Sequence, residues 1–166
     1  MGRSTNQTAG RSAVTTEPTT GSGPADKTPA GTLEVTITYL EMHRRPRSGL
    51  RPSLDEPIAI LQAHRPTLSF YRYLYCHVGE PWLWYERRAM DNETLREIIH
   101  DPAISIHVLY FDGVPAGYVE LDSRVDHEIE LAYFGLLPEF IGRGLGPWLL
   151  NWALDTAWNR DPSRIW

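Results

Sequence analysis

The sequence contains a single cysteine, Cys76, among its 166 residues. One thiol excludes an intramolecular disulfide and also excludes a zinc site built from several thiolates. Chains that lack disulfides are typical of reducing compartments, so the cysteine content predicts a cytoplasmic protein. We expect no metal site, because no His, Asp or Glu pattern supplies a set of ligands in place of thiolates.

Long apolar runs are also lacking. No run approaches the roughly 18 residues that a membrane-spanning helix needs, so we expect no membrane association. Apart from Met1, residues 1–31 contain one large apolar side chain, Val14, which excludes the apolar core of a secretory signal peptide. Thr, Ser, Gly and Pro dominate this stretch. It is therefore predicted to be a disordered tail, which leaves 32–166 as a single domain.

An excess of positive charge is the third absence. The formal net charge is −5 at pH 7 and the pI is about 5.6. Nucleic-acid-binding domains usually carry a basic face, so nucleic acid is not expected as a partner. An acidic chain suits a cationic substrate such as an amine. The apolar content of 42% is enough to build one hydrophobic core.

The most informative feature that is present is the glycine-rich segment Gly142-Arg143-Gly144-Leu145-Gly146. It follows the apolar run 130–138 and opens a helical pattern that continues to Trp158. The first backbone N–H groups of a helix have no partner within the helix, and the helix dipole favours an anion there. Glycines let a phosphate approach the backbone closely. The segment therefore predicts a phosphate-binding loop.

Two common nucleotide loops do not fit this segment. A Walker loop ends in Gly-Lys-Ser/Thr, whereas Pro147 and Trp148 follow the last glycine here. The dinucleotide fingerprint needs the spacing G-x-G-x-x-G within a βαβ unit, whereas the spacing here is G-x-G-x-G with about twenty residues after it.

The stretch from Leu136 to Leu150 resembles motif A of the GNAT acyltransferase superfamily, and the resemblance extends from about Ile58 to Trp166. The aromatic segments 70–75 and 78–88 look like an uncharacterised bacterial subgroup. The resemblance implies an α/β fold of the α+β type, with a mixed, mainly antiparallel sheet flanked by helices. It also implies acetyl-CoA as co-substrate, held by Leu136, Leu137, Ile141, Gly142, Arg143, Gly144, Leu145 and Gly146.

The chain departs from the motif at one position. The family pattern R/Q-x-x-G-x-G/A places Arg or Gln where this sequence has Ile141, which offers a phosphate only its backbone N–H. Arg143 is expected to add positive charge beside the loop. Two functions stay open at this point: an N-acetyltransferase acting on a primary amine of a small molecule or peptide, and a non-catalytic CoA-binding or interaction module.

Periodicity predicts the elements that precede and follow the loop. Strands are expected at 32–40, 58–63, 104–111, 114–121 and 128–137, and Asp112-Gly113 predicts a hairpin turn. Helices are expected at 66–78, at 93–100 after the N-cap Asp91, and at 144–159. In the first of these helices, Tyr71, Leu74, Tyr75 and Val78 form the apolar face.

Glu130 is the predicted catalytic base of the acetyltransferase. If the loop 122–127 brings Leu121 near Ile129, then Glu120 lies opposite Glu130, and two close carboxylates raise one pKa and attract an ammonium group. The resemblance also implies that main-chain N–H groups near 134–137 polarise the acyl carbonyl, with Gly135 allowing an irregular backbone.

The family domain normally continues with further strands and a helix, so the resemblance also implies that the sequence is truncated and lacks the C-terminal strands. An incomplete sheet would leave apolar surface uncovered, and a homodimer is one expected consequence.

Overall fold

The computed structural model describes residues 4–6, 38–46 and 57–166. Its contacts separate the chain into two units, Met1–Glu41 and Met42–Trp166. In the first unit, β1 (Ser4–Asn6) pairs antiparallel with β2 (Thr38–Leu40). The remainder of the predicted tail 1–31, and residues 32–37 of the predicted strand 32–40, lie outside the described residues.

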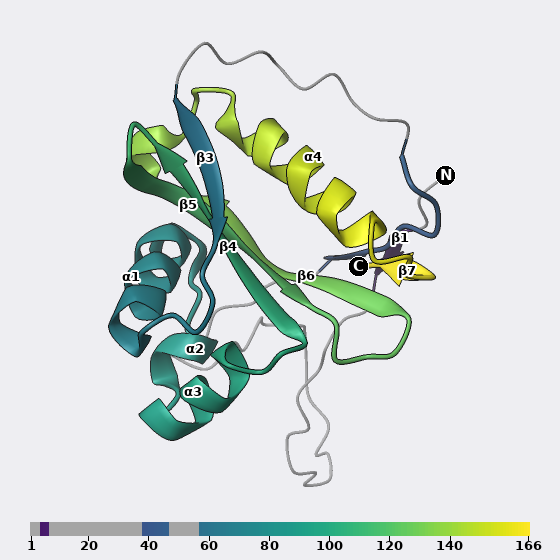
Figure 1. Ribbon diagram of the computed structural model, residues 1–166, viewed down its shortest axis with the longest axis horizontal. Helices are drawn as coiled ribbons and strands as arrows, with labels where there is room; N and C mark the ends of the chain where they lie inside the picture. Colours follow the sequence, from purple (N-terminus) through teal and green to yellow (C-terminus); the bar gives the residue numbers. More distant parts are fainter. Residues whose placement is uncertain (1–3, 7–37, 47–56) are drawn as a thin grey trace, which may run out of the picture. The chain divides into compact units, whose positions relative to one another are not determined.

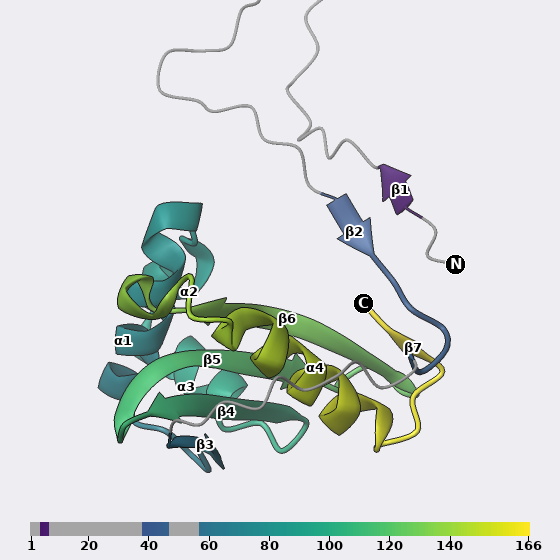
Figure 2. The same ribbon diagram turned by 90° about the horizontal axis from the view of Figure 1, so that it is seen from above.

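The second unit contains a five-stranded sheet in the order β3-β4-β5-β6-β7. Its strands are β3 (Ile58–Gln62), β4 (Ile104–Phe111), β5 (Val114–Asp122), β6 (Glu128–Leu136) and β7 (Arg164–Ile165). The first four pair antiparallel, and β7 pairs parallel with β6 at Glu128 and Ile129. Figure 2 shows these strands following one another across a curved sheet. The mixed, mainly antiparallel architecture confirms the predicted fold class.

Helices cover both faces of the sheet (Figure 1). On one face lie α1 (Leu68–Gly79), the 3-10 turn η1 (Glu80–Trp82), α2 (Glu86–Ala89) and α3 (Asn92–Ile99). On the other lies α4 (Leu145–Trp158), which follows the 3-10 turn η2 (Pro138–Phe140). Each face has its own apolar core, and alternation along β4 and β5 supplies side chains to both.

Local sequence signals account for most of these elements. Asp112 and Gly113 both have positive φ, as the tight turn between β4 and β5 requires. The Asp91 carboxylate accepts hydrogen bonds from the N–H groups of Glu93 and Thr94, which confirms it as the N-cap of α3. The predicted apolar face of α1 is confirmed as well, because Tyr71, Leu74, Tyr75 and Val78 are all buried.

Three details differ from prediction. Helix α1 begins after its N-cap Thr67, so Pro66 lies outside the helix rather than in its first turn. The periodicity of 144–159 predicts a core face of Leu149, Leu150, Ala153, Leu154 and Ala157, but Leu150 is 37% exposed and Leu145 is buried there instead. The short helix α2 was not predicted, because four residues are too few for a periodic pattern. Within the described residues, no helix has the length and apolar character needed to cross a membrane.

Candidate functional site

The predicted phosphate loop joins β6 to α4. Main-chain turns carry the chain from Leu137 through η2 to Gly144, which is the N-cap residue of α4. Gly142 and Gly144 have φ values of +86° and +76°, a backbone conformation that side chains rarely adopt. A Cβ atom built on either glycine would meet nothing within 4 Å, so the space above the loop is open. No side chain caps α4. The first turn of this helix therefore keeps its N–H groups for an anion.

Of the two side chains Ile141 and Arg143 in the loop, only Arg143 can bring positive charge to a bound phosphate. Ile141 is 57% exposed and offers no polar group. The Arg143 guanidinium carbon lies 5.4 Å from the centroid of the Phe111 ring and 5.3 Å from that of Phe140. These cation–π contacts hold the positive charge of Arg143 beside the loop. Gly146 and Leu145 then begin the helix, and Leu145 is fully buried.

The outer edge of β6 runs from the loop to Glu130. The Leu137 N–H donates to the Ala116 carbonyl on β5, so the main-chain groups of Leu137 point toward β5. Because main-chain groups alternate along an antiparallel ladder, Phe134 and Leu136 point to the opposite edge. On that edge the described strand partner is β7, which pairs only with Glu128 and Ile129. Beyond it, the Leu131 N–H donates a hydrogen bond to the Trp166 carbonyl. The edge beyond Leu131 thus presents main-chain N–H and C=O groups without a strand partner among the described residues.

A β-bulge interrupts β6 near the middle of this edge. Leu121 pairs with Leu131, but the next residue back, Glu120, pairs with Tyr133, so Ala132 is the extra residue. The bulge was expected at 134–137 around Gly135, and that expectation is wrong. Gly135 serves packing instead, since a Cβ there would come within 2.3 Å of the Val78 side chain.

The register of the β5–β6 hairpin overturns the predicted carboxylate pair. Asp122, and not Glu120, is the residue opposite Glu130. This pair lies between the turn and the bulge, and its register differs by two residues from the assumed one, because Leu121 pairs with Leu131 rather than with Ile129. Glu130 remains half-buried at the start of the unpaired edge, and it lines a cavity of about 270 Å³ with Asp122, Arg124, Val125 and Trp166.

The two opposed carboxyl groups have different electrostatics. Burial raises the pKa of Glu130, and the nearby Asp122 charge raises it further. Asp122 is buried too, but Arg124 donates to both of its carboxylate oxygens at 2.6–3.1 Å, and the net effect lowers the pKa of Asp122. Asp122 is therefore a fixed anion, and Glu130 is the carboxyl group of this cavity that is free to take a proton.

Glu120 belongs to a buried cluster that sequence reasoning missed. Its fully buried carboxylate accepts from the Tyr71 hydroxyl at 2.6 Å and from the Arg87 guanidinium at 2.9 Å. Arg87 also lies over the Tyr133 ring, 5.4 Å from its centroid, and the Tyr133 hydroxyl donates to Glu86. The charged sequence Glu86-Arg87-Arg88 gave no signal that its middle residue is buried. This cluster anchors α2 against β6 next to the bulge.

Two histidines on or beside the sheet, His107 and His127, are not among the residues that line the Glu130 cavity. His107 on β4 is 7% exposed and stacks edge-on against Trp152 of α4. His127 lies in the loop before β6 with a side chain 77% exposed, near Asp126. Among the described residues no group of three or more His, Cys, Asp or Glu side chains is placed to hold a metal ion.

Comparison with solved structures supports the fold. An aminoglycoside acetyltransferase from an uncultured soil metagenomic sample, in complex with trehalose, aligns with a TM-score of 0.53 at 10% identity, covering 66% of this chain and 75% of that one. A second aminoglycoside acetyltransferase from such a sample aligns with a TM-score of 0.53 at 13% identity, covering 66% and 78%. An N-acetyltransferase from Thermoplasma acidophilum, in complex with coenzyme A, aligns with a TM-score of 0.45 at 16% identity, covering 64% and 75%.

Comparison with curated protein sequences gives no significant match. The family model described as Acetyltransferase (GNAT) family matches residues 61–166, well over half of the chain. This range contains the end of β3, the strands β4 to β7, the glycine loop and Glu130. The match agrees with the open loop at the start of α4 and with the mixed sheet that leads into it. The chain belongs to the GNAT acetyltransferase family.

Proposed function

We propose that the protein is an acetyl-CoA-dependent N-acetyltransferase that transfers the acetyl group to a primary amine by direct attack. One observation carries this proposal. The open glycine loop and Glu130 lie at the two ends of one stretch of β6, and the edge between them offers main-chain groups without a strand partner among the described residues. An extended thioester-bearing chain pairs with such an edge in the way an added strand does.

The loop fits the pyrophosphate of CoA. The N–H groups of Leu145 and Gly146 begin a helix without a side-chain cap, and the positive φ of Gly142 and Gly144 keeps side chains out of the open space above the loop. The Ile141 N–H donates to the Pro138 carbonyl at 3.3 Å instead. Leu136 directs its main-chain groups to the free edge, whereas the Leu137 amide is already bonded, so Leu137 contributes through packing. When bound, acetyl-CoA supplies an acetyl group activated as a thioester.

Glu130 acts as the base. An amine is protonated at neutral pH and must lose a proton before its nitrogen lone pair can attack a carbonyl carbon. Glu130 accepts that proton, directly or through a water molecule, while the N–C bond forms and the C–S bond breaks. Edge N–H groups beside the bulge donate to the carbonyl oxygen as it gains negative charge. The nitrogen loses its second proton to solvent as the amide forms, and the leaving thiolate takes a proton from solvent. Proton loss from Glu130 then restores the base.

The acceptor is a small molecule or peptide that carries a primary amine. Glu130 and Asp122 face each other in the cavity, and with Arg124 the three charges sum to −1 when both carboxyl groups are ionised. This balance favours a cation. The two aligned soil-sample structures are of aminoglycoside acetyltransferases, and polyamine antibiotics of that class are a reasonable first set of acceptors to assay.

A non-catalytic CoA-binding module is the second candidate. Ile141 favours it, because this exposed apolar side chain stands where the family pattern has Arg or Gln. Two measurements separate the candidates: calorimetric binding of CoA, and thiol release from acetyl-CoA across a panel of amines. Amine-dependent thiol release supports the enzyme. CoA binding without release from any amine supports the module, and absence of CoA binding contradicts both.

A further inference from the structure

A second hollow, of about 710 Å³, lies between the start of α1 and α3. It is lined by nine residues from the segment before α1, from α1 and from α3: Arg65, Pro66, Thr67, Leu68, Ser69, Arg72, Asn92, Arg96 and His100. Three of these are arginines and none is acidic. The concentration of positive charge is unexpected in a chain whose net charge is −5. The lining shares no residue with β6, the glycine loop or the cavity of Glu130.

The helical spacing of the lining residues shows that two helix faces converge here. On α3, Asn92, Arg96 and His100 follow at intervals of four residues and so lie on one face. A hydrogen bond of 2.5 Å from the Arg72 guanidinium to the Asn92 side chain joins this face to α1. Arg72 also donates to the Met90 carbonyl at 2.8 Å, which fixes its position.

The loop before α1 is held against the same face. The Nε2 atom of His100 lies 3.0 Å from the Pro66 carbonyl oxygen. Because a carbonyl oxygen only accepts hydrogen bonds, Nε2 carries the proton. This contact places Arg65, the residue before Pro66, at the rim of the hollow. The three arginines thus come from three separate segments.

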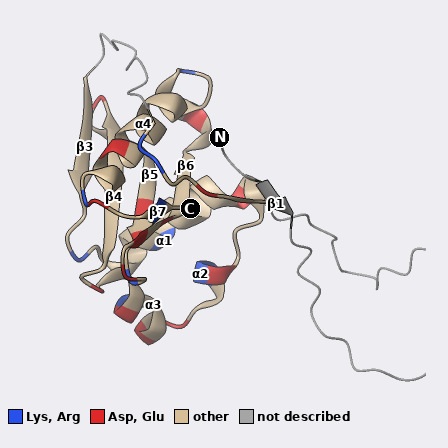
Figure 3. Cartoon of the chain, turned by 90° about the vertical axis from the view of Figure 1, so that its right-hand side faces the viewer, with Lys and Arg blue, Asp and Glu red and all other residues tan. Residues whose placement is uncertain are grey.

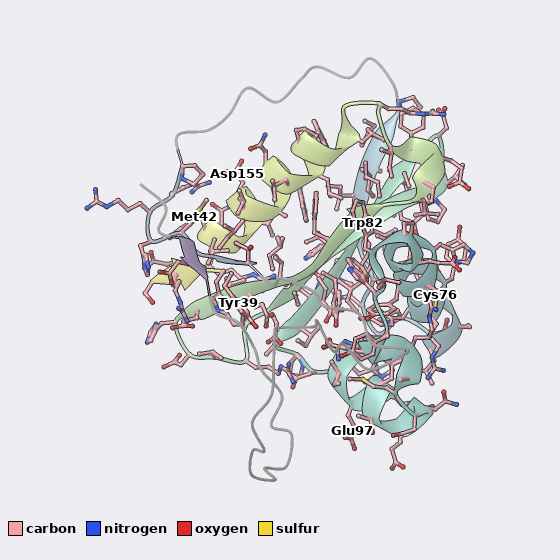
Figure 4. All side chains as sticks on the ribbon, turned by 180° about the vertical axis from the view of Figure 1, so that it is seen from behind. Tyr39, Met42, Cys76, Trp82, Glu97 and Asp155 are labelled. Atoms are coloured by element: carbon pink, nitrogen blue, oxygen red, sulfur yellow. The ribbon has the colours of Figure 1, made fainter. Side chains whose placement is uncertain are left out.

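Two of these arginines have no polar partner among the described residues, whereas the Arg72 guanidinium is bonded to two neutral groups. Within the described part of the chain, neither Arg65 nor Arg96 forms a hydrogen bond or an ion pair through its guanidinium group. Acidic and basic residues alternate along α3 (Figure 3), but its acids do not enter the hollow. Figure 4 shows Glu97 projecting outward from α3. The positive charges of the hollow are therefore available to a ligand.

We propose that this hollow is a second binding site, for the phosphate group of a small phosphorylated molecule, separate from the acetyl-CoA site. A guanidinium group matches the spacing of phosphate oxygens and donates two parallel hydrogen bonds. Two unpartnered guanidinium groups, together with the positive charge of Arg72, suit an oxyanion with three or four oxygens better than a carboxylate with two. The size of the hollow lies within the range of about 300–1,000 Å³ that is usual for small-molecule sites.

The test is calorimetric titration of the protein with inorganic pyrophosphate, with and without saturating CoA. The double variant R65Q/R96Q removes the two arginines that have no polar partner among the described residues, and both side chains are exposed, so the fold is expected to be retained. The single variant R88Q is the control, because Arg88 is an exposed arginine outside the hollow. Malonate, a dicarboxylate, replaces pyrophosphate in a parallel titration.

We expect pyrophosphate to bind the CoA-saturated protein, and to bind R65Q/R96Q at least tenfold more weakly, with R88Q unchanged. The proposal is overturned by any of three results: no binding once CoA is present, equal binding by R65Q/R96Q, or equal affinity for malonate. If the protein binds no CoA, the function proposed above fails. The comparison of the variants in pyrophosphate alone still decides the present proposal.

Discussion

Glu130 lies directly opposite Asp122 in the β5–β6 ladder, and the two carboxyl groups share one cavity. Arg124 holds Asp122 as an anion, and burial together with that anion raises the pKa of Glu130. Two like carboxyl groups in one site divide their roles when their surroundings push their pKa values apart. Here the arrangement separates a fixed charge from a carboxyl group that can take a proton, as the base proposed above requires.

We expect E130Q to lower the rate of acetyl transfer by about 10²–10⁴-fold, the usual contribution of a general base. The amide has nearly the same shape as the carboxylate, so the affinity for CoA should change little. Steady-state kinetics and calorimetry measure the two quantities. E97Q, which removes an exposed acid on the outer side of α3, is the matched control. Full turnover in E130Q would exclude Glu130 as the base.

The pH dependence of kcat/KM should report Glu130. A base with a raised pKa loses activity as pH falls through that pKa, so the acidic limb should lie above the ordinary Glu value of about 4.3. In D122N the limb should move to lower pH. The substitution removes a negative charge that disfavours ionised Glu130, and it frees Arg124 to pair with it. An unchanged limb in D122N would show that another group controls the profile.

The buried ion pair of Arg87 and Glu120 predicts a large stability effect. In R87M the fully buried carboxylate of Glu120 loses its counter-charge, which typically costs about 3–5 kcal/mol of unfolding free energy. Burial already raises the pKa of Glu120, so the cost should shrink at low pH, where the carboxyl group takes a proton. Urea unfolding at two pH values measures this difference.

The double variant R87M/E120Q gives the control for this prediction. It removes both charges, and the amide oxygen introduced at position 120 still accepts a hydrogen bond from Tyr71, so part of the lost stability should return. If the double variant is no more stable than R87M, then an unpaired buried charge is not the cause of the loss.

Patterns that repeat locally could be predicted from the sequence, and contacts set by irregular backbone could not. The strand bounds of β4, the Asp112-Gly113 turn and the Asp91 cap each depend on a few neighbouring residues. The partner of Glu130 depends on how the loop after Asp122 turns the chain into β6, and no turn motif in 123–127 marks that register. The burial of Arg87 likewise depends on Glu120, 33 residues away.

The glycine loop gave a clear motif because positive φ limits the residue type. Gly144 and Gly146 allow a comparison between a loop position that requires a positive φ and one that does not. Gly144 has φ +76°, so G144A should cost about 1–2 kcal/mol of stability and weaken CoA binding by shifting the loop.

A Cβ on Gly146 would lie 3.8 Å from Leu136, an ordinary contact within a helix. We therefore expect G146A to gain about 0.5–1 kcal/mol and to retain CoA binding, as the Gly/Ala pattern of the family implies. Thermal unfolding and calorimetry test both; equal losses in the two variants would contradict the backbone argument.

His107 predicts a pH-dependent stability that is independent of catalysis. Burial lowers its pKa to about 4, and Arg160 adds to the effect. Between pH 6.5 and 4 the unfolded chain binds a proton that the folded protein does not, so stability falls as pH falls through this window and its His107 component levels off below it. At about 1.4 kcal/mol per pKa unit, the loss is about 3 kcal/mol.

H107Q removes the titrating group and should flatten this part of the curve, while H127Q, which changes an exposed histidine, should follow the parent protein. Urea unfolding from pH 7 to 4 measures the slopes, and parallel curves for H107Q and the parent protein would contradict the assignment.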